Sequence, residues 1–141
     1  MTISINVLPG VGAEILGVDI GGDLELSEFE TIKQTFSHHG LVFFRDQKIS
    51  EMGHADFAEQ FGTIDINRFF AAHPDYPQIA LVTKEADQVV NIGGGWHTDH
   101  SYDREPALGS ILVARELPPS GGDTWFASMY KAYENLSNGM K

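Results

Sequence analysis

The residues best suited to chemistry are His97 and Asp99, which stand two positions apart just after the triple glycine at 93–95. In an extended segment, residues i and i+2 project from the same face, about 6.6 Å apart along the strand. An imidazole and a carboxylate on one face can bind one cation, and both belong to the two-histidine, one-carboxylate donor set of non-haem Fe(II) oxygenases. We therefore predict that the two side chains lie on one strand face and converge. A His-x-Asp pair is also common by chance, so the spacing alone leaves a purely structural role open.

The composition decides which ligands a metal could have and which partners are disfavoured. The sequence contains no cysteine, which excludes a disulfide, a thiolate metal site and a cysteine nucleophile. Any metal must therefore be bound by nitrogen and oxygen. Nine basic and 20 acidic side chains give a net charge of −11. This charge opposes binding to nucleic acid or to an anionic membrane, because both depend on Lys and Arg contacts with phosphate.

The length of 141 residues and the apolar content of 42% are those of one globular domain, which we expect to span 1–141. No stretch approaches the roughly 18 apolar residues needed to cross a bilayer. The first residues lack a basic segment followed by an apolar one, so we expect no signal peptide and a cytoplasmic protein.

The first helix is predicted from its capping signals. Ser27 and Glu30 have the spacing of a capping box, and Gly40 is suited to the left-handed position that ends a helix. Between them the inward face is expected to carry three apolar side chains at helical spacing, namely Phe29, Ile32 and Phe36.

Two further helices are expected at 50–61 and 128–136, and a long loop at 63–78. On the second helix we expect Met52 to point inward and His54 to be solvated. Strands are expected wherever apolar residues alternate or form short runs. These ranges are 3–7, 13–20, 41–44, 79–82, 88–92, the segment around His97, 107–115 and 124–127. Strands with helices mostly towards the ends of the chain indicate an α+β fold.

Short motifs occur along the chain in the order of one enzyme family. They are Leu41-Val42-Phe43-Phe44-Arg45-Asp46-Gln47, Phe57-Ala58-Glu59-Gln60-Phe61-Gly62, Trp96-His97-Thr98-Asp99, Gly109-Ser110-Ile111-Leu112, Glu116-Leu117-Pro118, Gly121-Gly122-Asp123-Thr124 and Ala132-Tyr133-Glu134-Asn135-Leu136-Ser137. Together they resemble the taurine dioxygenase (TauD/TfdA) family of Fe(II)- and 2-oxoglutarate-dependent oxygenases. The resemblance covers nearly the whole chain and is far more specific than the His-x-Asp pair.

The resemblance implies a fold, a metal and a co-substrate. The fold would be part of a double-stranded β-helix, a jelly roll of the clavaminate synthase type, cut short and flanked by helices. His97 and Asp99 would bind Fe(II), and the Thr124 hydroxyl would hold a carboxylate of 2-oxoglutarate. The family also uses a downstream histidine as third ligand and an arginine for 2-oxoglutarate, and no residue of this sequence matches either by position. We therefore expect the N-terminal half of a dioxygenase, inactive by itself.

The resemblance also marks substrate positions, and these differ from the taurine-oxidising pattern. That pattern has histidine, tyrosine and asparagine where this chain has Asn67, Phe70 and Gly93. Because a site built on hydrogen bonds discriminates against ligands that leave them unmade, taurine is not the expected substrate. His100 and Tyr102 stand on the substrate side and could donate hydrogen bonds. The alternative for these two is an exposed imidazole and a half-buried ring.

Three functions remain open from the sequence. The first is a dioxygenase acting on a small organic substrate, and the second is a non-catalytic binding or assembly module on the same scaffold. The third, a small zinc hydrolase, lacks a third ligand. A jelly roll cut near its middle would also expose apolar strands and unpaired edges, so we expect self-association, most simply as a homodimer.

Overall fold

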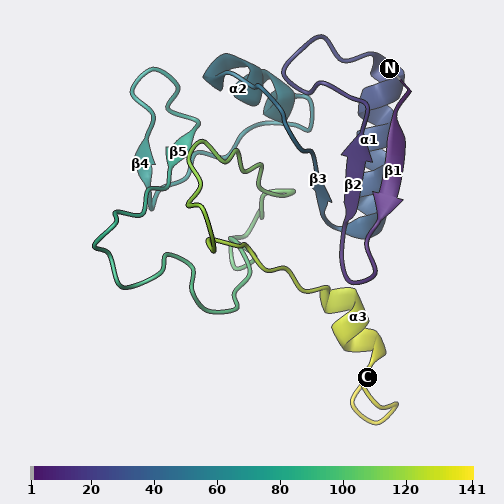
Figure 1. Cartoon of the computed structure of the whole chain (residues 1–141). Coiled ribbons are helices and arrows are strands. Elements are labelled where there is room, and N and C mark those ends of the chain that lie inside the picture. Colours follow the sequence, from purple (N-terminus) through teal and green to yellow (C-terminus); the bar gives the residue numbers. More distant parts are fainter. Residues whose placement is uncertain (1) are drawn as a thin grey trace. The chain divides into compact units, whose positions relative to one another are not determined.

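The computed structural model describes residues 2–141 (Figure 1). The chain falls into two compact units. One unit takes the chain up to Lys48 together with Arg115–Lys141, and the other is Ile49–Ala114. The elements combine helices with short strands, as predicted for an α+β fold. No helix among residues 2–141 is long and apolar enough to cross a membrane.

The first unit contains a three-stranded sheet of order β1-β2-β3. β1 (Ser4–Val7) pairs antiparallel with β2 (Ala13–Leu16), and β2 pairs in parallel with β3 (Val42–Phe43). Gly12, at φ 91°, accepts a hydrogen bond from the Leu8 amide in the β1–β2 turn. The parallel pair needs a crossover, which helix α1 supplies. All three strands lie within their predicted ranges, and each is shorter.

Helix α1 (Leu26–His39) closes the core of this unit over the sheet. Its capping box joins Glu25 and Glu28, not Ser27 and Glu30 as predicted, because the Glu25 carboxylate itself accepts from the Glu28 amide. Gly40 ends the helix at φ 72°, as predicted. Most of the buried residues of the unit are apolar and come from β2, the turn after it and α1, namely Ala13, Ile15, Ile20, Phe29 and Ile32.

The second unit begins with helix α2 (Glu51–Glu59), whose Ser50 cap accepts from the Gly53 amide at 3.1 Å. Its buried residues are Ala55 and Phe57, while Met52 is 58% exposed. The predicted inward face was therefore wrong at Met52, since the large Phe57 ring takes a buried position instead. A hairpin of β4 (Ala71–Ala72) and β5 (Ala80–Leu81) follows, and β4 lies in the segment predicted as loop.

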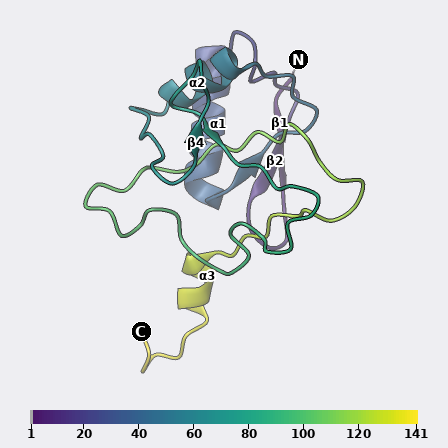
Figure 2. The same ribbon diagram turned by 90° about the vertical axis from the view of Figure 1, so that its left-hand side faces the viewer.

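Residues 82–128 contain no helix and no strand in the structure. Figure 2 shows this irregular course in the teal and green segment that precedes α3. The strands predicted at 88–92, around His97, at 107–115 and at 124–127 are therefore wrong for the described chain. A strand forms only where a neighbour satisfies its backbone N–H and C=O groups, and these stretches pair with no strand among residues 2–141.

Helix α3 (Met129–Glu134) belongs to the first unit and is shorter than the predicted 128–136. Its cap is Ser128, whose hydroxyl accepts from the Lys131 amide at 3.2 Å. The Lys131 ammonium donates to the carbonyl of Gly10 in the β1–β2 turn. This bond links α3 to the sheet side of its own unit.

Candidate metal centre

His97 and Asp99 approach each other in an irregular loop of the second unit. His97 Nε2 lies 3.3 Å from Asp99 Oδ1, and both side chains are more than half exposed. The predicted convergence is confirmed, whereas the predicted strand is wrong, as the loop has no ladder partner. Ligand bonds of about 2.0–2.2 Å place neighbouring ligand atoms roughly 3 Å apart, so the observed separation suits two donors on one cation.

The hydrogen bond of the other ring nitrogen sets the orientation of His97. His97 Nδ1 lies 2.7 Å from the carbonyl oxygen of Gly95. A carbonyl can only accept, so Nδ1 carries the proton and donates. In the neutral ring, Nε2 then presents its lone pair to the Asp99 carboxylate. Two acceptors facing each other are stabilised by a cation between them, and this arrangement of the second nitrogen is typical of metal-binding histidines.

Two further residues contact this pair. A Cβ built on Gly93, which has φ 65°, would come within 3.2 Å of His97 Cε1. Gly93 was predicted at a substrate position, and the structure places it against the imidazole. The hydroxyl of Ser110 donates to Asp99 Oδ2 at 3.4 Å. Ser110 was not among the predicted site residues, because nothing in the sequence indicates which hydroxyl reaches a given carboxylate.

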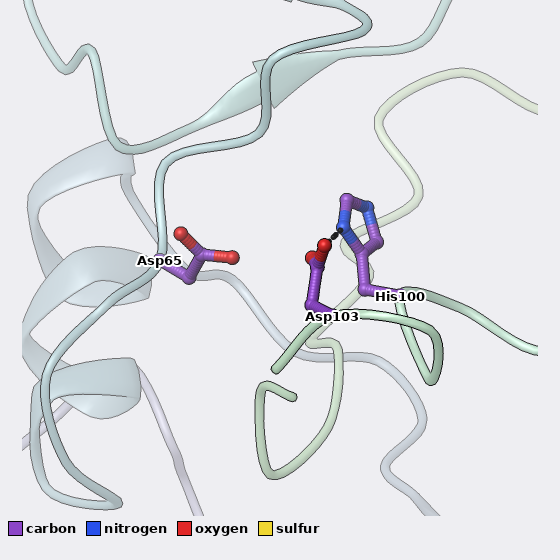
Figure 3. A group of neighbouring side chains, drawn as sticks. All are labelled: Asp65, His100 and Asp103. Carbon is purple, nitrogen blue, oxygen red and sulfur yellow. Dashed lines mark hydrogen bonds and ion pairs between the residues drawn. The ribbon is translucent and has the colours of Figure 1, made fainter. Parts of the chain in front are cut away.

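A second group of polar side chains in the same unit was also missed. One ligand atom from each of Asp65, His100 and Asp103 lies within 4.8 Å of the others. Figure 3 shows Asp65 entering from a separate segment and facing the other two, with a dashed line between His100 Nδ1 and Asp103 Oδ2 at 3.3 Å. No signal in the sequence joins Asp65 to this loop.

Arg68 makes this second group less suited to a cation. Its guanidinium nitrogen donates to both oxygens of Asp103 at 2.7 Å. The hydrogen bond from Arg68 lowers the pKa of Asp103 below its ordinary value, with a smaller contribution from His100. Asp103 is thus an anion that already has a cationic partner. The group links the segment at 65–68 to the loop at 100–103.

His100 and Tyr102 lie in an aromatic cluster with Phe69. The ring of His100 is 5.6 Å from that of Phe69 and 5.9 Å from that of Tyr102, centroid to centroid. The His100 side chain is 19% exposed, so an exposed imidazole is wrong, and Tyr102 is 69% exposed, so a half-buried ring is wrong too. His100 also has φ 49°, a left-handed conformation that is uncommon outside glycine. Their contact with a substrate stays a prediction.

Asn67 shapes the backbone that precedes β4. Its Oδ1 accepts from the amides of Phe69 at 2.8 Å and Phe70 at 3.1 Å, which is a turn stabilised by its own side chain. The ring of Phe70 is 37% exposed. Thr124 is exposed and belongs to the other compact unit. The ligand contacts of these residues stay predictions.

Comparison with known proteins identifies the family. The model of the taurine catabolism dioxygenase TauD, TfdA family matches residues 4–141. The chain belongs to this family. Pentalenolactone F synthase of Streptomyces avermitilis is 33% identical over 99% of the chain and 49% of its own length. The alpha-ketoglutarate-dependent 2,4-dichlorophenoxyacetate dioxygenase of Cupriavidus pinatubonensis is 30% identical over 96% of the chain and 53% of its own length.

A solved member of the TauD, TfdA family has the same backbone course. The crystal structure of a taurine dioxygenase from Burkholderia xenovorans superposes with a TM-score of 0.85 and 31% identity, covering 98% of this chain and 49% of that protein. The chain thus spans about half the length of these relatives. The resemblance drawn from the sequence motifs is confirmed.

Proposed function

We propose that this chain supplies part of the active site of an Fe(II)- and 2-oxoglutarate-dependent dioxygenase, which hydroxylates a small organic substrate with release of succinate and CO2. One observation carries the proposal. In a chain of the TauD, TfdA family, His97 Nε2 lies 3.3 Å from Asp99 Oδ1. The relatives whose names specify alpha-ketoglutarate dependence support the co-substrate.

The residues present fit an iron ion. His97 would bind through Nε2 and Asp99 through Oδ1, a nitrogen and oxygen donor pair of the kind used by non-haem Fe(II). The Gly95 carbonyl keeps His97 Nδ1 protonated, and Ser110 engages the second oxygen of Asp99. Bound iron would supply the redox chemistry of O2 activation, while the protein orients the ligands.

The Thr124 hydroxyl is proposed to donate a hydrogen bond to a carboxylate of 2-oxoglutarate. We further propose that the stretches at 88–92, 107–115 and 124–127 become strands of a jelly roll when their neighbours are present. Their β-branched and apolar content supports this, as does the superposition with the taurine dioxygenase structure.

Substrate recognition is proposed to differ from that of taurine oxidation. The side-chain oxygen of Asn67 already accepts hydrogen bonds from two backbone amides, and the side chain of Phe70 is an apolar ring. At Gly93 the asparagine of the taurine pattern would press on the His97 ring, since even a Cβ there comes within 3.2 Å. These features favour a substrate held by fewer polar contacts than a sulfonate.

Titration of the purified chain with Fe(II) without oxygen tests the metal site. We expect His97→Ala and Asp99→Asn to weaken binding at least about 10-fold, because each removes a ligand. His38→Ala, in an exposed position of α1, is the matched control and should bind as the parent does. Equal Fe(II) affinity in the parent and in both site variants would refute the proposal.

Succinate release tests the proposed dependence on further donors. With Fe(II), ascorbate, 2-oxoglutarate and a panel of substrates, we expect little or no turnover from the 141-residue chain. Two protein ligands hold iron weakly, and loss of one side of a buried charge pair costs about 2–5 kcal/mol. Robust turnover that disappears in His97→Ala would show that the chain is active alone. Retained Fe(II) binding with no turnover in any longer form would favour the binding module.

A further inference from the structure

We propose that Ser110 is a positioning residue for the Asp99 carboxylate and that His54 of α2 holds Ser110 in place. Neither residue was assigned to the site by its sequence motif. The inference rests on the proposed function, since it concerns the same metal pair. All the residues involved belong to the compact unit Ile49–Ala114.

Asp99 has little packing to restrain it, because its side chain is 60% exposed. Its two oxygens nevertheless have separate contacts, Oδ1 with His97 at 3.3 Å and Oδ2 with the Ser110 hydroxyl at 3.4 Å. Opposite contacts on the two oxygens define the rotation of the carboxylate about its own axis. Oδ1 is thereby turned towards Nε2 of the His97 imidazole.

Ser110 itself needs an anchor, since residues 107–114 form neither helix nor strand. The anchor is a hydrogen bond to the carbonyl of the next residue, Ile111. His54 Nε2 lies 3.2 Å from the carbonyl oxygen of Ile111, and a carbonyl only accepts, so Nε2 donates. His54 is part-buried on a helix that is capped by Ser50 and has Ala55 and Phe57 buried. The hydrogen bonds thus connect an ordered helix to the candidate metal ligand.

This arrangement affects whether Asp99 would bind a cation through one oxygen or through both. A hydroxyl donating to Oδ2 leaves Oδ1 with its lone pairs available and favours binding through one oxygen. Hydrogen bonds to ligating carboxylates typically change metal affinity by about 10–100-fold when they are removed. With alanine at 110, the carboxylate could rotate or bind through both oxygens. The expected result is a weaker site with a different ligand field.

Cobalt(II) is a suitable probe because its visible spectrum reports the number and geometry of its ligands. In titrations of the purified 141-residue chain, we expect Ser110→Ala to weaken binding about 10-fold and to alter the spectrum. Ser110→Thr keeps the hydroxyl and should restore both. Ser101→Ala is the matched control, since the Ser101 hydroxyl contacts Thr98 Oγ1 at 2.6 Å. It should leave affinity and spectrum unchanged.

His54 is tested in the same way. We expect His54→Ala to weaken cobalt binding about 3-fold, the size expected of one neutral hydrogen bond. His54→Gln places an amide donor near the Ile111 carbonyl and should recover part of the loss.

Ser110→Ala should leave the midpoint of urea unfolding unchanged, because Ser110 is exposed.

The outcomes separate this inference from the proposed function. If His97→Ala abolishes cobalt binding but Ser110→Ala binds like the parent, the positioning role is refuted and the metal site stands. If the parent does not bind cobalt, or binds it independently of His97, both are refuted. If Ser110→Thr fails to restore the spectrum, or Ser101→Ala changes it equally, the hydroxyl of Ser110 does not position Asp99.

Discussion

Residues 12–57 and residues 82–128 both contain large apolar side chains. Several of these are buried in the first stretch, and most are exposed in the second. Ile32 is fully buried and Ile15 is 2% exposed, whereas Leu112, Leu117 and Trp125 are 72%, 74% and 77% exposed. No described residue after Phe57 is buried. An apolar residue becomes core only where another element covers it, and large exposed apolar surfaces generally mark interaction sites.

In the first stretch, the apolar side chains are covered by elements that follow one another in the sequence. α1 crosses from β2 to β3 and packs over the strands that it joins, so sheet and helix cover each other. The second stretch has strand-like composition and no strand to pair with among residues 2–141. Among residues 2–141, the later segment is therefore neither paired into a sheet nor buried.

The largest expected effect is on the core. Ile32→Ala should lower the free energy of unfolding by about 2–5 kcal/mol, because it leaves a cavity at a fully buried position. Leu117→Ala, at 74% exposure, should change it by less than about 0.5 kcal/mol. Urea unfolding of both variants measures the contrast. Equal losses would show that residues 82–128 are also covered in solution.

Self-association is the second expected effect, and we propose a homodimer formed through the exposed apolar segment. Light scattering over a dilution series should give an apparent mass of twice 15.5 kDa at high concentration. Leu112→Asp should weaken the dimer about 10-fold or more, since burying a leucine contributes about 1.5–3 kcal/mol. Salt should strengthen it by screening the net charge of −11 on each copy.

A mass near 15.5 kDa at every micromolar concentration, without binding of an apolar-surface dye, would contradict the dimer. Exposed residues such as Leu108 and Leu112 would then be covered within a single chain.

The irregular region also contains specific local contacts, and Gly93 tests one of them. Gly93→Ala should cost about 1–2 kcal/mol, because φ 65° is unfavourable for alanine. The added methyl should also displace the His97 ring and shift its imidazole NMR signals. Gly95→Ala is the control, since a Cβ there meets no atom within 4 Å. Unchanged His97 signals in Gly93→Ala would contradict the close approach of Gly93 to the His97 ring.

The smallest expected effect is the pH dependence of the pair formed by Arg68 and Asp103. The pKa of Asp103 is lowered in the folded chain, so the pair stabilises the fold above the ordinary carboxyl pKa of about 3.9. This contribution is lost as the pH falls through the lower folded value. NMR titration of the Asp103 carboxyl measures it. Arg68→Gln should return that pKa towards its ordinary value, and an unaffected pKa would exclude the pairing in solution.

Several features were predictable from the sequence because they depend on neighbours in the chain. Gly40 ends α1, and Ser50 and Ser128 cap α2 and α3, since capping involves backbone groups within a few residues. The convergence of His97 and Asp99 is equally local, since the two residues stand two positions apart in one loop. The family followed from motifs in a fixed order, which no tertiary contact is needed to recognise.

Other features were decided only by tertiary structure. Ser110 reaches Asp99 11 positions away, His54 reaches the Ile111 carbonyl 57 positions away, and Asp65 faces His100 from a separate segment. The predicted strand at 107–115 failed for the same reason. Its alternating apolar residues set a propensity, but a strand also needs a neighbour for its backbone groups, and that neighbour is a property of the fold and not of the segment.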